Sequence, residues 1–263
     1  MISIYDALSQ LQKNNEPAAL CTVVRSEGST PRHVGSKMLV YPDGRFIGTV
    51  GGGELESRVI KAALESLRES RAQNLSYTMA DPSRGDPGVC GGTVEVFVEP
   101  ILPSVMIVVI GGGHVGKAVV HLAKWLGFRV AVSDDRAEFC NPESVPGADA
   151  YYPVPMAELP SQLKLTRQTY LVITSRGSPI DAAGMPSLLE TDAGYIGVIG
   201  SKRRWLTTVK ALKEKGVSEE RIARVHSPMG LELNAETPEE IAVSIMAEIL
   251  MLRDEGTGRM MKE

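Results

Sequence analysis

The N-terminal part of the chain combines two spacings of apolar positions. Two stretches have apolar residues every three or four positions, which predicts helices at residues 4–13 and 55–71. Short apolar or β-branched runs predict strands at residues 18–24, 37–41, 45–50, 75–79 and 93–98. Asp43 and Gly44 lie between the second and third of these runs, where this dipeptide favours a hairpin turn. The pattern therefore predicts an α+β domain.

The rest of the chain alternates strand-like and helix-like patterns. Strands are predicted at residues 105–110, 129–133, 170–174 and 194–199. Helices are predicted at residues 114–126, 181–190, 202–215 and 238–253. Because strands and helices alternate, the strands are expected to form a parallel sheet with helices on both faces.

Two prolines separate these patterns. Pro100 and Pro103 lie within four residues of one another, and proline continues neither a helix nor a central strand. Residues 99–104 are therefore predicted to be a linker. The chain is interpreted as an α/β protein in which a smaller α+β domain, residues 1–100, precedes a parallel-sheet domain, residues 105–263.

Composition and charge exclude several classes of function. The formal net charge is −4 and aromatic residues make up 5% of the chain, whereas nucleic-acid binders usually carry a basic face. No apolar run approaches the roughly 18 residues of a membrane span, and residues 1–15 lack the features of a signal peptide. The three cysteines are odd in number and far apart, which indicates reduced thiols and a cytoplasmic protein.

A glycine-rich motif follows the strand predicted at residues 105–110. Gly111, Gly113 and Gly116 have the G-x-G-x-x-G spacing of dinucleotide-binding turns and open the next predicted helix. In such turns the glycines allow a tight turn, a close approach of the pyrophosphate and close packing of helix on strand. The motif predicts a Rossmann-like domain, with NAD(P) or another nucleotide as its candidate ligand. An inherited turn that binds no nucleotide is the alternative.

Other candidate ligands of a nucleotide lie at the ends of the predicted strands. Asp134 lies 18 positions after Gly116 and is expected to accept a hydrogen bond from a ribose hydroxyl. The neighbouring Asp135 and Arg136 leave the choice between NAD and NADP open. His114 either faces a ligand or is an exposed residue at a helix start. Loops 174–177 and 200–203 also end strands at this edge, which adds two candidates to the site, Arg176 and Ser201.

Several residues in these loops have alternative roles. Ser201 is a candidate helix cap as well as a ligand, and Lys202 and Arg203 carry charge suited to a phosphate. Asp181 is expected to be either a helix-start charge or a functional acid.

The N-terminal domain has a second glycine cluster. Gly51, Gly52 and Gly53 are expected to expose backbone N–H groups to an anion, and Arg32 and Lys37 are candidates for the counter-charge. Cys90 is flanked by glycines just before a predicted strand, so it is either an accessible thiolate or a small buried side chain. Cys21 lies within an apolar strand and is expected to be structural.

Six separated motifs resemble one family. The segments are GSTPRHVGSKM, GTVGGGELE, VCGGTVEVFVEP, IGGGHVG with SDDR, YIGVIGSKRR and SPMGLELNAETPEEIAVSIMAEIL. They occur in family order from about residue 20 to 250, and together they resemble the XdhC/CoxI family.

The resemblance implies a role in cofactor maturation. Members of that family are accessory proteins that bind molybdenum cofactor, the molybdenum complex of molybdopterin, and protect it while a cysteine desulfurase supplies its terminal sulfur. They then deliver it to a molybdenum hydroxylase such as xanthine dehydrogenase, and they are not the hydroxylase itself. The implied cofactor site comprises the turn Gly51, Gly52 and Gly53 together with Glu56, Arg32 and Cys90. A homodimer would provide a groove for so large a cofactor.

The chain departs from the family pattern at two positions. Glu54 stands where many members have a cysteine, and Ser178 stands where many have a histidine. Cys90 is therefore the remaining candidate for a thiol that contacts molybdenum or carries sulfur. Any role that the histidine has in the family is not expected here.

Two other functions fit part of the sequence. An NAD(P)-dependent oxidoreductase would explain residues 105–263, with a proton donor among His114, His121 and His226, but it leaves the N-terminal motifs without a role. A nucleotide-sensing regulatory module would bind NAD without turnover.

Overall fold

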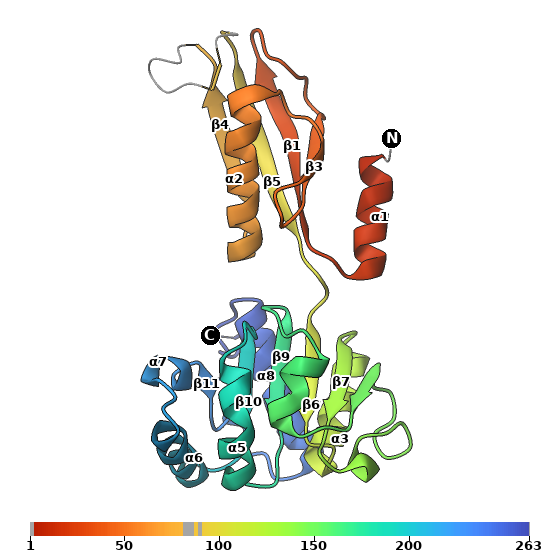
Figure 1. The fold of residues 1–263 in the computed structure, drawn as a ribbon, viewed down its shortest axis with the longest axis vertical. Coiled ribbons are helices and arrows are strands. Elements are labelled where there is room, and N and C mark those ends of the chain that lie inside the picture. The colour runs from red at the N-terminus through yellow and green to blue at the C-terminus, as the bar shows by residue number, and fades with distance from the viewer. Residues whose placement is uncertain (1–2, 81–86, 89–90, 263) are drawn as a thin grey trace. The chain divides into compact units, whose positions relative to one another are not determined.

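The computed structural model describes residues 3–80, 87–88 and 91–262. The chain divides into two compact units, Met1–Pro103 and Ser104–Glu263, each of which has its own core (Figure 1).

The N-terminal unit contains a five-stranded antiparallel sheet in the order β3-β2-β1-β5-β4. Its strands are β1 (Ala18–Glu27), β2 (Lys37–Val40), β3 (Phe46–Gly48), β4 (Gln73–Thr78) and β5 (Thr93–Ile101). Its helices are α1 (Ile4–Asn14) and α2 (Gly53–Glu69). The predicted α+β arrangement is confirmed.

The side chains of β1 alternate between two apolar clusters. Cys21 and Val23 pack with residues of α2, including Val59, whereas Ala18 packs with Leu11 of α1. The two helices therefore cover opposite faces of the sheet, because successive side chains of a strand point to opposite sides.

The prediction that the strand at 93–98 ends before the two prolines is wrong. β5 continues through Pro100, which pairs with Ala19 of β1. On its other side, β5 pairs with β4 only as far as Val98. Pro100 therefore lies where the strand has one open side, and proline is tolerated there.

The C-terminal unit contains a six-stranded parallel sheet in the order β11-β10-β9-β6-β7-β8. Its strands are β6 (Met106–Ile110), β7 (Arg129–Ser133), β8 (Ala150–Tyr152), β9 (Thr169–Ile173), β10 (Tyr195–Val198) and β11 (Val225–His226). The chain runs outward from β6 to β8 and then returns to place β9 on the other side of β6. The carboxyl ends of β6 and β9 thus form the point where the strand order reverses, which is the usual ligand position in such sheets.

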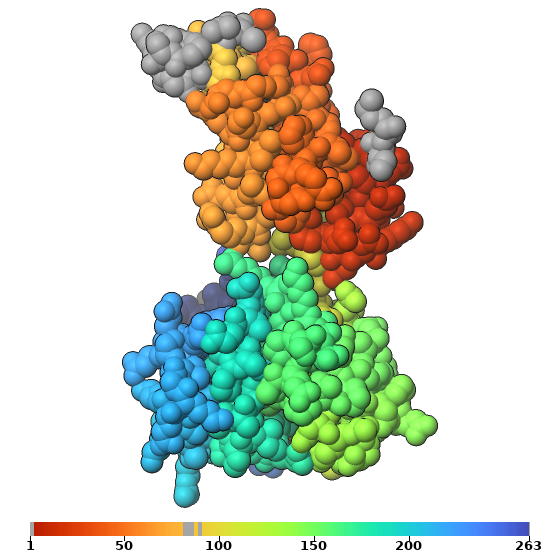
Figure 2. Space-filling view, viewed as in Figure 1, coloured from red at the N-terminus to blue at the C-terminus, as the bar shows by residue number. Residues whose placement is uncertain are grey.

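Helices cover both faces of this sheet, as predicted. The larger helices are α3 (His114–Trp125), α5 (Ser178–Leu189), α6 (Lys202–Glu214) and α8 (Pro238–Arg253), and the short ones are α4 (Leu159–Gln162), α7 (Glu219–Ile222) and the 3₁₀ turns η2 (Ala137–Phe139) and η3 (Met156–Glu158). Ile107 and Val109 of β6 pack with α3 and α8, whereas Val108 and Ile110 pack with α5 and α6. Figure 2 shows the second of these faces covered by side chains coloured from green to blue.

No helix within the described part of the chain is long and apolar enough to cross a membrane.

Candidate functional sites

The glycine-rich turn after β6 is fixed by close packing at two of its three glycines. Gly111 has φ +117°, and a Cβ there would lie 2.6 Å from the carbonyl oxygen of Thr174. A Cβ at Gly116 would lie 2.0 Å from the carbonyl oxygen of Gly111. Gly113, in contrast, has φ −74° and faces open space where it caps α3. The turn therefore leaves room for a ligand at the N-terminus of α3, where backbone N–H groups favour anions.

Asp134, at the carboxyl end of β7, is bound on every side by donors. Its Oδ2 accepts hydrogen bonds from the backbone N–H of Gly112 at 2.9 Å and from Nη2 of Arg136 at 2.9 Å. Its Oδ1 accepts hydrogen bonds from the backbone N–H of Arg136 at 3.0 Å and from Nε of Arg136 at 2.9 Å. Burial alone would raise the pKa of Asp134, but these donors hold it below its ordinary value.

Arg136 is itself held in a defined orientation. Its guanidinium carbon lies 3.9 Å from the centre of the Phe139 ring, in a cation–π contact. About a quarter of its side chain, 27%, remains exposed. Phe139 belongs to η2, a single turn that gave no periodic signal in the sequence.

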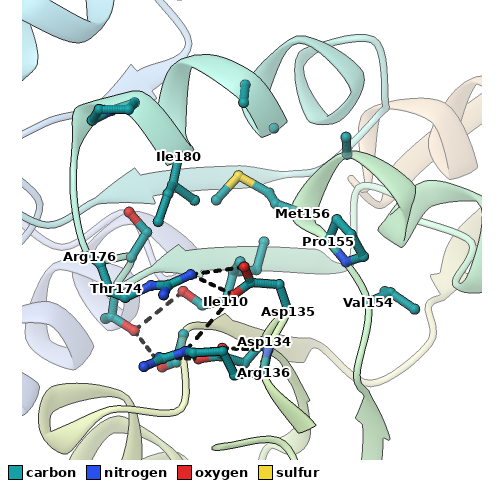
Figure 3. Close-up of a pocket in the computed structure, with 16 residues that line it drawn as sticks. Ile110, Asp134, Asp135, Arg136, Val154, Pro155, Met156, Thr174, Arg176 and Ile180 are labelled. Atoms are coloured by element: carbon teal, nitrogen blue, oxygen red, sulfur yellow. Dashed lines mark hydrogen bonds and ion pairs between the residues drawn. The ribbon is translucent and has the colours of Figure 1, made fainter.

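A cavity of about 300 Å³ lies beside Asp134 at the carboxyl ends of β6, β7 and β9. Figure 3 shows an apolar side and a polar side. The apolar side includes Val154, Pro155, Met156 and Ile180, and the polar side includes Asp134, Asp135, Arg136 and Arg176. A concave, mostly apolar site with a few polar groups is typical of small-molecule binding.

An ion pair links the two loops on the polar side of this cavity. Nη2 of Arg176 lies 2.8 Å from both carboxylate oxygens of Asp135, and each side chain is about half exposed. The structure therefore brings Arg176 and Asp134, two of the residues that the sequence suggested for a nucleotide site, into the same cavity.

A buried ion pair lies next to the cavity. Asp181, near the start of α5, has no exposed surface, and its Oδ2 accepts hydrogen bonds from Nη2 of Arg204 at 2.8 Å and from Nε at 3.2 Å. The hydroxyl of Ser175 donates to Oδ1 of Asp181. Nη2 of Arg204 also lies 2.8 Å from the Ser175 hydroxyl oxygen. Asp181 is thus a buried structural acid, with Ser175 and Arg204 as its partners.

Sequence reasoning considered the basic residues beside Arg204 and missed Arg204 itself. Lys202 and Arg203 are exposed, and Ser201 caps α6 by accepting the backbone N–H of Arg204 at 3.3 Å. The helical spacing could have indicated Arg204 as a buried residue. It precedes the apolar Leu212 by two helical turns and therefore lies on the buried face of α6.

A second cavity, of about 500 Å³, lies between α3 and α8. His114, Lys117 and His121 line it from α3, and Pro238, Glu239 and Val243 line it from α8. The two histidines predicted as a ligand contact or proton donor therefore belong to this cavity and do not line the one beside Asp134. Within the described ranges, no three His, Cys, Asp or Glu residues are grouped so that they could hold a metal ion.

His226 contacts a buried acid. Its Nδ1 lies 2.9 Å from Oε1 of Glu248, and its ring stacks on Tyr195 with ring centres 4.9 Å apart. Glu248 also accepts hydrogen bonds from the Tyr195 hydroxyl at 3.3 Å and from the backbone N–H of Gly230. Burial acts to raise the pKa of Glu248, but His226 and the other donors hold it below its ordinary value.

The glycine turn of the N-terminal unit has an unusual backbone. Gly51, Gly52 and Gly53 have φ values of +156°, +86° and +59°, and the last two face open space at the start of α2. Glu56 braces this turn, because its Oε1 accepts hydrogen bonds from the Thr49 hydroxyl and from the backbone N–H of residue 50 at 3.3 Å. The backbone N–H of Gly51 donates to the Thr49 hydroxyl at 3.2 Å, so it is not free for an anion as expected, and only Gly52 and Gly53 remain as candidates for that contact.

The other candidate site residues of this unit differ in exposure and in the contacts that their side chains already make. Nζ of Lys37 donates to the Thr22 hydroxyl at 3.0 Å, whereas the Arg32 side chain is exposed. Cys90 lies outside the described residues. Cys21 has no exposed surface, and burial raises its pKa to about 12, so it is not a thiolate at neutral pH. Cys140 is also buried, which raises its pKa.

Two family models match this chain. One is described as the XdhC Rossmann domain and matches residues 107–249, which is more than half of the chain. The other is described as the XdhC and CoxI family and matches residues 11–78.

Similar proteins include one of about twice the length. The chain is 35% identical over 262 residues to the uncharacterized protein YqeB of Escherichia coli K12. That alignment covers 99% of this chain and 48% of YqeB, so the chain spans about half the length of this relative.

Two more distant relatives align over most of their own length. One is named as a probable xanthine dehydrogenase subunit of Bacillus subtilis strain 168 and is 24% identical, with 96% of this chain and 98% of that protein covered. The molybdenum cofactor insertion chaperone PaoD of Escherichia coli K12 is 21% identical, with 90% and 83% covered.

One solved structure has a similar fold. A crystal structure named as a xanthine dehydrogenase of Bacillus halodurans superposes with a TM-score of 0.51 at 22% identity, covering 99% of this chain and 98% of that one. At this level of identity, the likeness shows the fold alone.

Proposed function

The chain belongs to the XdhC/CoxI family, and on this basis we propose that it is an accessory protein in the maturation of molybdenum hydroxylases. It binds molybdenum cofactor, protects it during sulfuration and delivers it to an enzyme of the xanthine dehydrogenase type. A cysteine desulfurase would be its second partner. The observation that carries this proposal is the alignment of a relative named as a molybdenum cofactor insertion chaperone over 90% of this chain.

The N-terminal turn fits the phosphate end of a pterin cofactor. Gly52 caps α2 and Gly53 begins it, and both face open space at the helix N-terminus, where free N–H groups and the helix dipole favour an anion. Arg32 is exposed and offers a bidentate donor for a phosphate. Lys37 is engaged with Thr22, so we give it the smaller part.

Cys90 is the proposed thiol of this site. A thiolate is a soft ligand, suited to molybdenum or to a sulfur that is being transferred. Its assignment rests on the sequence, because the residue lies outside the described part of the chain.

Cofactor retention by the full chain tests the proposal. The purified protein is mixed with molybdenum cofactor and passed over a gel-filtration column, and the pterin is then measured by fluorescence after oxidation and the molybdenum by elemental analysis. We expect stoichiometric co-elution with the wild-type protein. Absence of both pterin and molybdenum from the protein peak would refute the proposal.

Variants locate the site. Cys90→Ser and Arg32→Ala are each expected to lose retention without a change in the melting temperature. Arg45→Ala is the matched control for charge, because Arg45 is also exposed in the same unit, where it pairs with Asp43. If Arg45→Ala reduces retention as much as Arg32→Ala, the contact is a general charge effect and the assignment of Arg32 is wrong.

The cavity beside Asp134 favours a second function, nucleotide binding by the C-terminal unit. It lies at the point where the strand order reverses and adjoins the glycine-rich turn. Among the described residues that line it there is no histidine to serve as a proton donor. We therefore propose a bound nucleotide that regulates the protein, in preference to an NAD(P)-dependent oxidoreductase.

A further inference from the structure

We propose that the cavity beside Asp134 selects a nucleotide whose ribose carries a 2′-phosphate, as in NADP, and that Arg136 makes this selection. The inference rests on the nucleotide binding proposed above and is independent of molybdenum cofactor binding.

The acceptor positions of Asp134 are already occupied. An ionised carboxylate offers about four lone-pair positions. Four N–H donors already occupy Asp134: the backbone N–H of Gly112 and three donors of Arg136. The side chain is 3% exposed. A free ribose hydroxyl needs an acceptor at this point, and Asp134 has none to offer while Arg136 stays in place.

Arg136 still has N–H donors that Asp134 does not use. Its contacts with Asp134 use Nε and Nη2, so the Nη1 group, with its two hydrogens, forms no hydrogen bond to the described residues. The guanidinium is fixed against the ring of Phe139 and partly exposed. The position next to the ribose therefore presents donors where a NAD site presents an acceptor. Donors of this kind bind phosphate, and an arginine near this acid is the usual receptor for a 2′-phosphate.

The two carboxylates on the polar side of the cavity are paired with arginines. Arg136 neutralises Asp134, and Arg176 neutralises Asp135 from the opposite loop. Neither carboxylate is therefore left unpaired to repel a phosphate. Arg176 donates to Asp135 through Nη2 alone, which leaves Nε and Nη1 as further donors on the polar side of the cavity.

The cavity also suits the rest of such a ligand. Its volume of about 300 Å³ is at the lower end of the range for small-molecule sites. Its apolar side, with Pro155, Met156 and Ile180, offers a surface for one flat heteroaromatic ring.

Binding measurements with the full chain test the inference. The affinities of NADP⁺ and NAD⁺ are measured by isothermal titration calorimetry at one fixed salt concentration. We expect NADP⁺ to bind at least about tenfold tighter, which corresponds to about one lost charge-assisted contact in NAD⁺. Adenosine 2′,5′-bisphosphate should compete with NADP⁺, and adenosine 5′-monophosphate should compete far less.

Arg136→Ala gives a readout that a purely structural role would not produce. Removing the guanidinium takes away the donor for the phosphate and frees two acceptor positions on Asp134. We expect NADP⁺ affinity to fall at least about tenfold while NAD⁺ affinity rises. Arg129→Ala is the control of equal charge, because Arg129 is exposed at the opposite, amino end of β7. It should leave both affinities unchanged.

Each outcome decides a different point. If NAD⁺ binds the wild-type protein as tightly as NADP⁺, the selection by Arg136 is wrong, although nucleotide binding stands. If neither nucleotide binds, both the inference and the proposed nucleotide binding are wrong. The comparison of the two nucleotides on the wild-type protein decides the matter even where Arg136→Ala does not fold. Retention of molybdenum cofactor is measured separately and is not affected by these results.

Discussion

The buried ion pair between Asp181 and Arg204 is expected to contribute strongly to the stability of the C-terminal unit. Asp181 has no exposed surface, and the Arg204 side chain is 22% exposed. The change is Arg204→Ala. It removes both N–H donors that reach Oδ2 of Asp181, at 2.8 and 3.2 Å, and leaves the carboxylate with the Ser175 hydroxyl as its side-chain donor.

The expected cost is large because a buried charge loses its partner. Breaking a buried ion pair from one side costs about 3–5 kcal/mol of unfolding free energy, much of it from the charge that remains. Arg204 also donates to the backbone carbonyl of Ser175 at 3.2 Å, and that contact is lost as well. For a unit of this size, the melting temperature should fall by about 6–20 °C.

Urea unfolding followed by tryptophan fluorescence measures the change. Both tryptophans of the chain, Trp125 and Trp205, lie in the unit that contains the pair, so the signal reports on that unit. Arg203→Ala is the matched control, because Arg203 is the neighbouring residue on α6 and is exposed. It should change the unfolding free energy by less than about 0.5 kcal/mol.

A second variant separates the pair from its surroundings. Asp181→Leu combined with Arg204→Met replaces both charges with apolar groups of similar size. Such a replacement is often neutral or stabilising, so the double variant should be more stable than Arg204→Ala alone. The reasoning is wrong if Arg204→Ala costs no more than Arg203→Ala, or if the double variant is less stable than the single one.

Two further predictions concern single positions. Gly116→Ala should destabilise the C-terminal unit by about 1–3 kcal/mol or more, because its Cβ would lie 2.0 Å from the carbonyl oxygen of Gly111, whereas Gly113→Ala, in open space, should melt near the wild-type temperature. Equal melting temperatures for these two variants would contradict the packing argument. Because the folded-state pKa of Glu248 lies below its ordinary value, its contribution to stability is complete above that value and is lost as the pH falls through the folded pKa. The stability difference between the wild-type protein and Glu248→Gln, measured by urea unfolding, should therefore shrink between about pH 5 and pH 3, and a constant difference would show that the pKa of Glu248 is not lowered in the folded protein.

The larger elements could be predicted because each carries a periodic pattern. The helix predicted at residues 238–253 has those bounds in the structure, where Thr237 caps it through a capping box with Glu240. The strand at 129–133 and the alternation that places helices on both faces are also confirmed. The short elements β8, β11, α4 and α7 were not predicted, since two to four residues are too few for either period to show.

The sequence predicted the position of the candidate nucleotide site, but it did not predict how the charged side chains there are paired. The spacing of Gly111, Gly113 and Gly116 indicated the turn, and the structure shows why the first and third are glycines. The partner of Asp134 could not be read from the sequence, because Arg136 either points away to solvent or turns back onto the acid. Packing against Phe139 settles this orientation.

By itself, the sequence determined the local elements, their order and the residue types available at the ends of the strands. These follow from periods of two and 3.6 residues and from the backbone freedom of glycine, all of which act over short distances along the chain. Only the tertiary structure decided which side chains meet. Asp181 and Arg204 are 23 positions apart in sequence, and Asp135 and Arg176 are 41 apart. Such pairs form because parallel strands end at one edge of the sheet, which brings together side chains that are distant in sequence. Whether a charged side chain at this edge can bind a ligand or only stabilises the fold depends on the side chain with which it is paired.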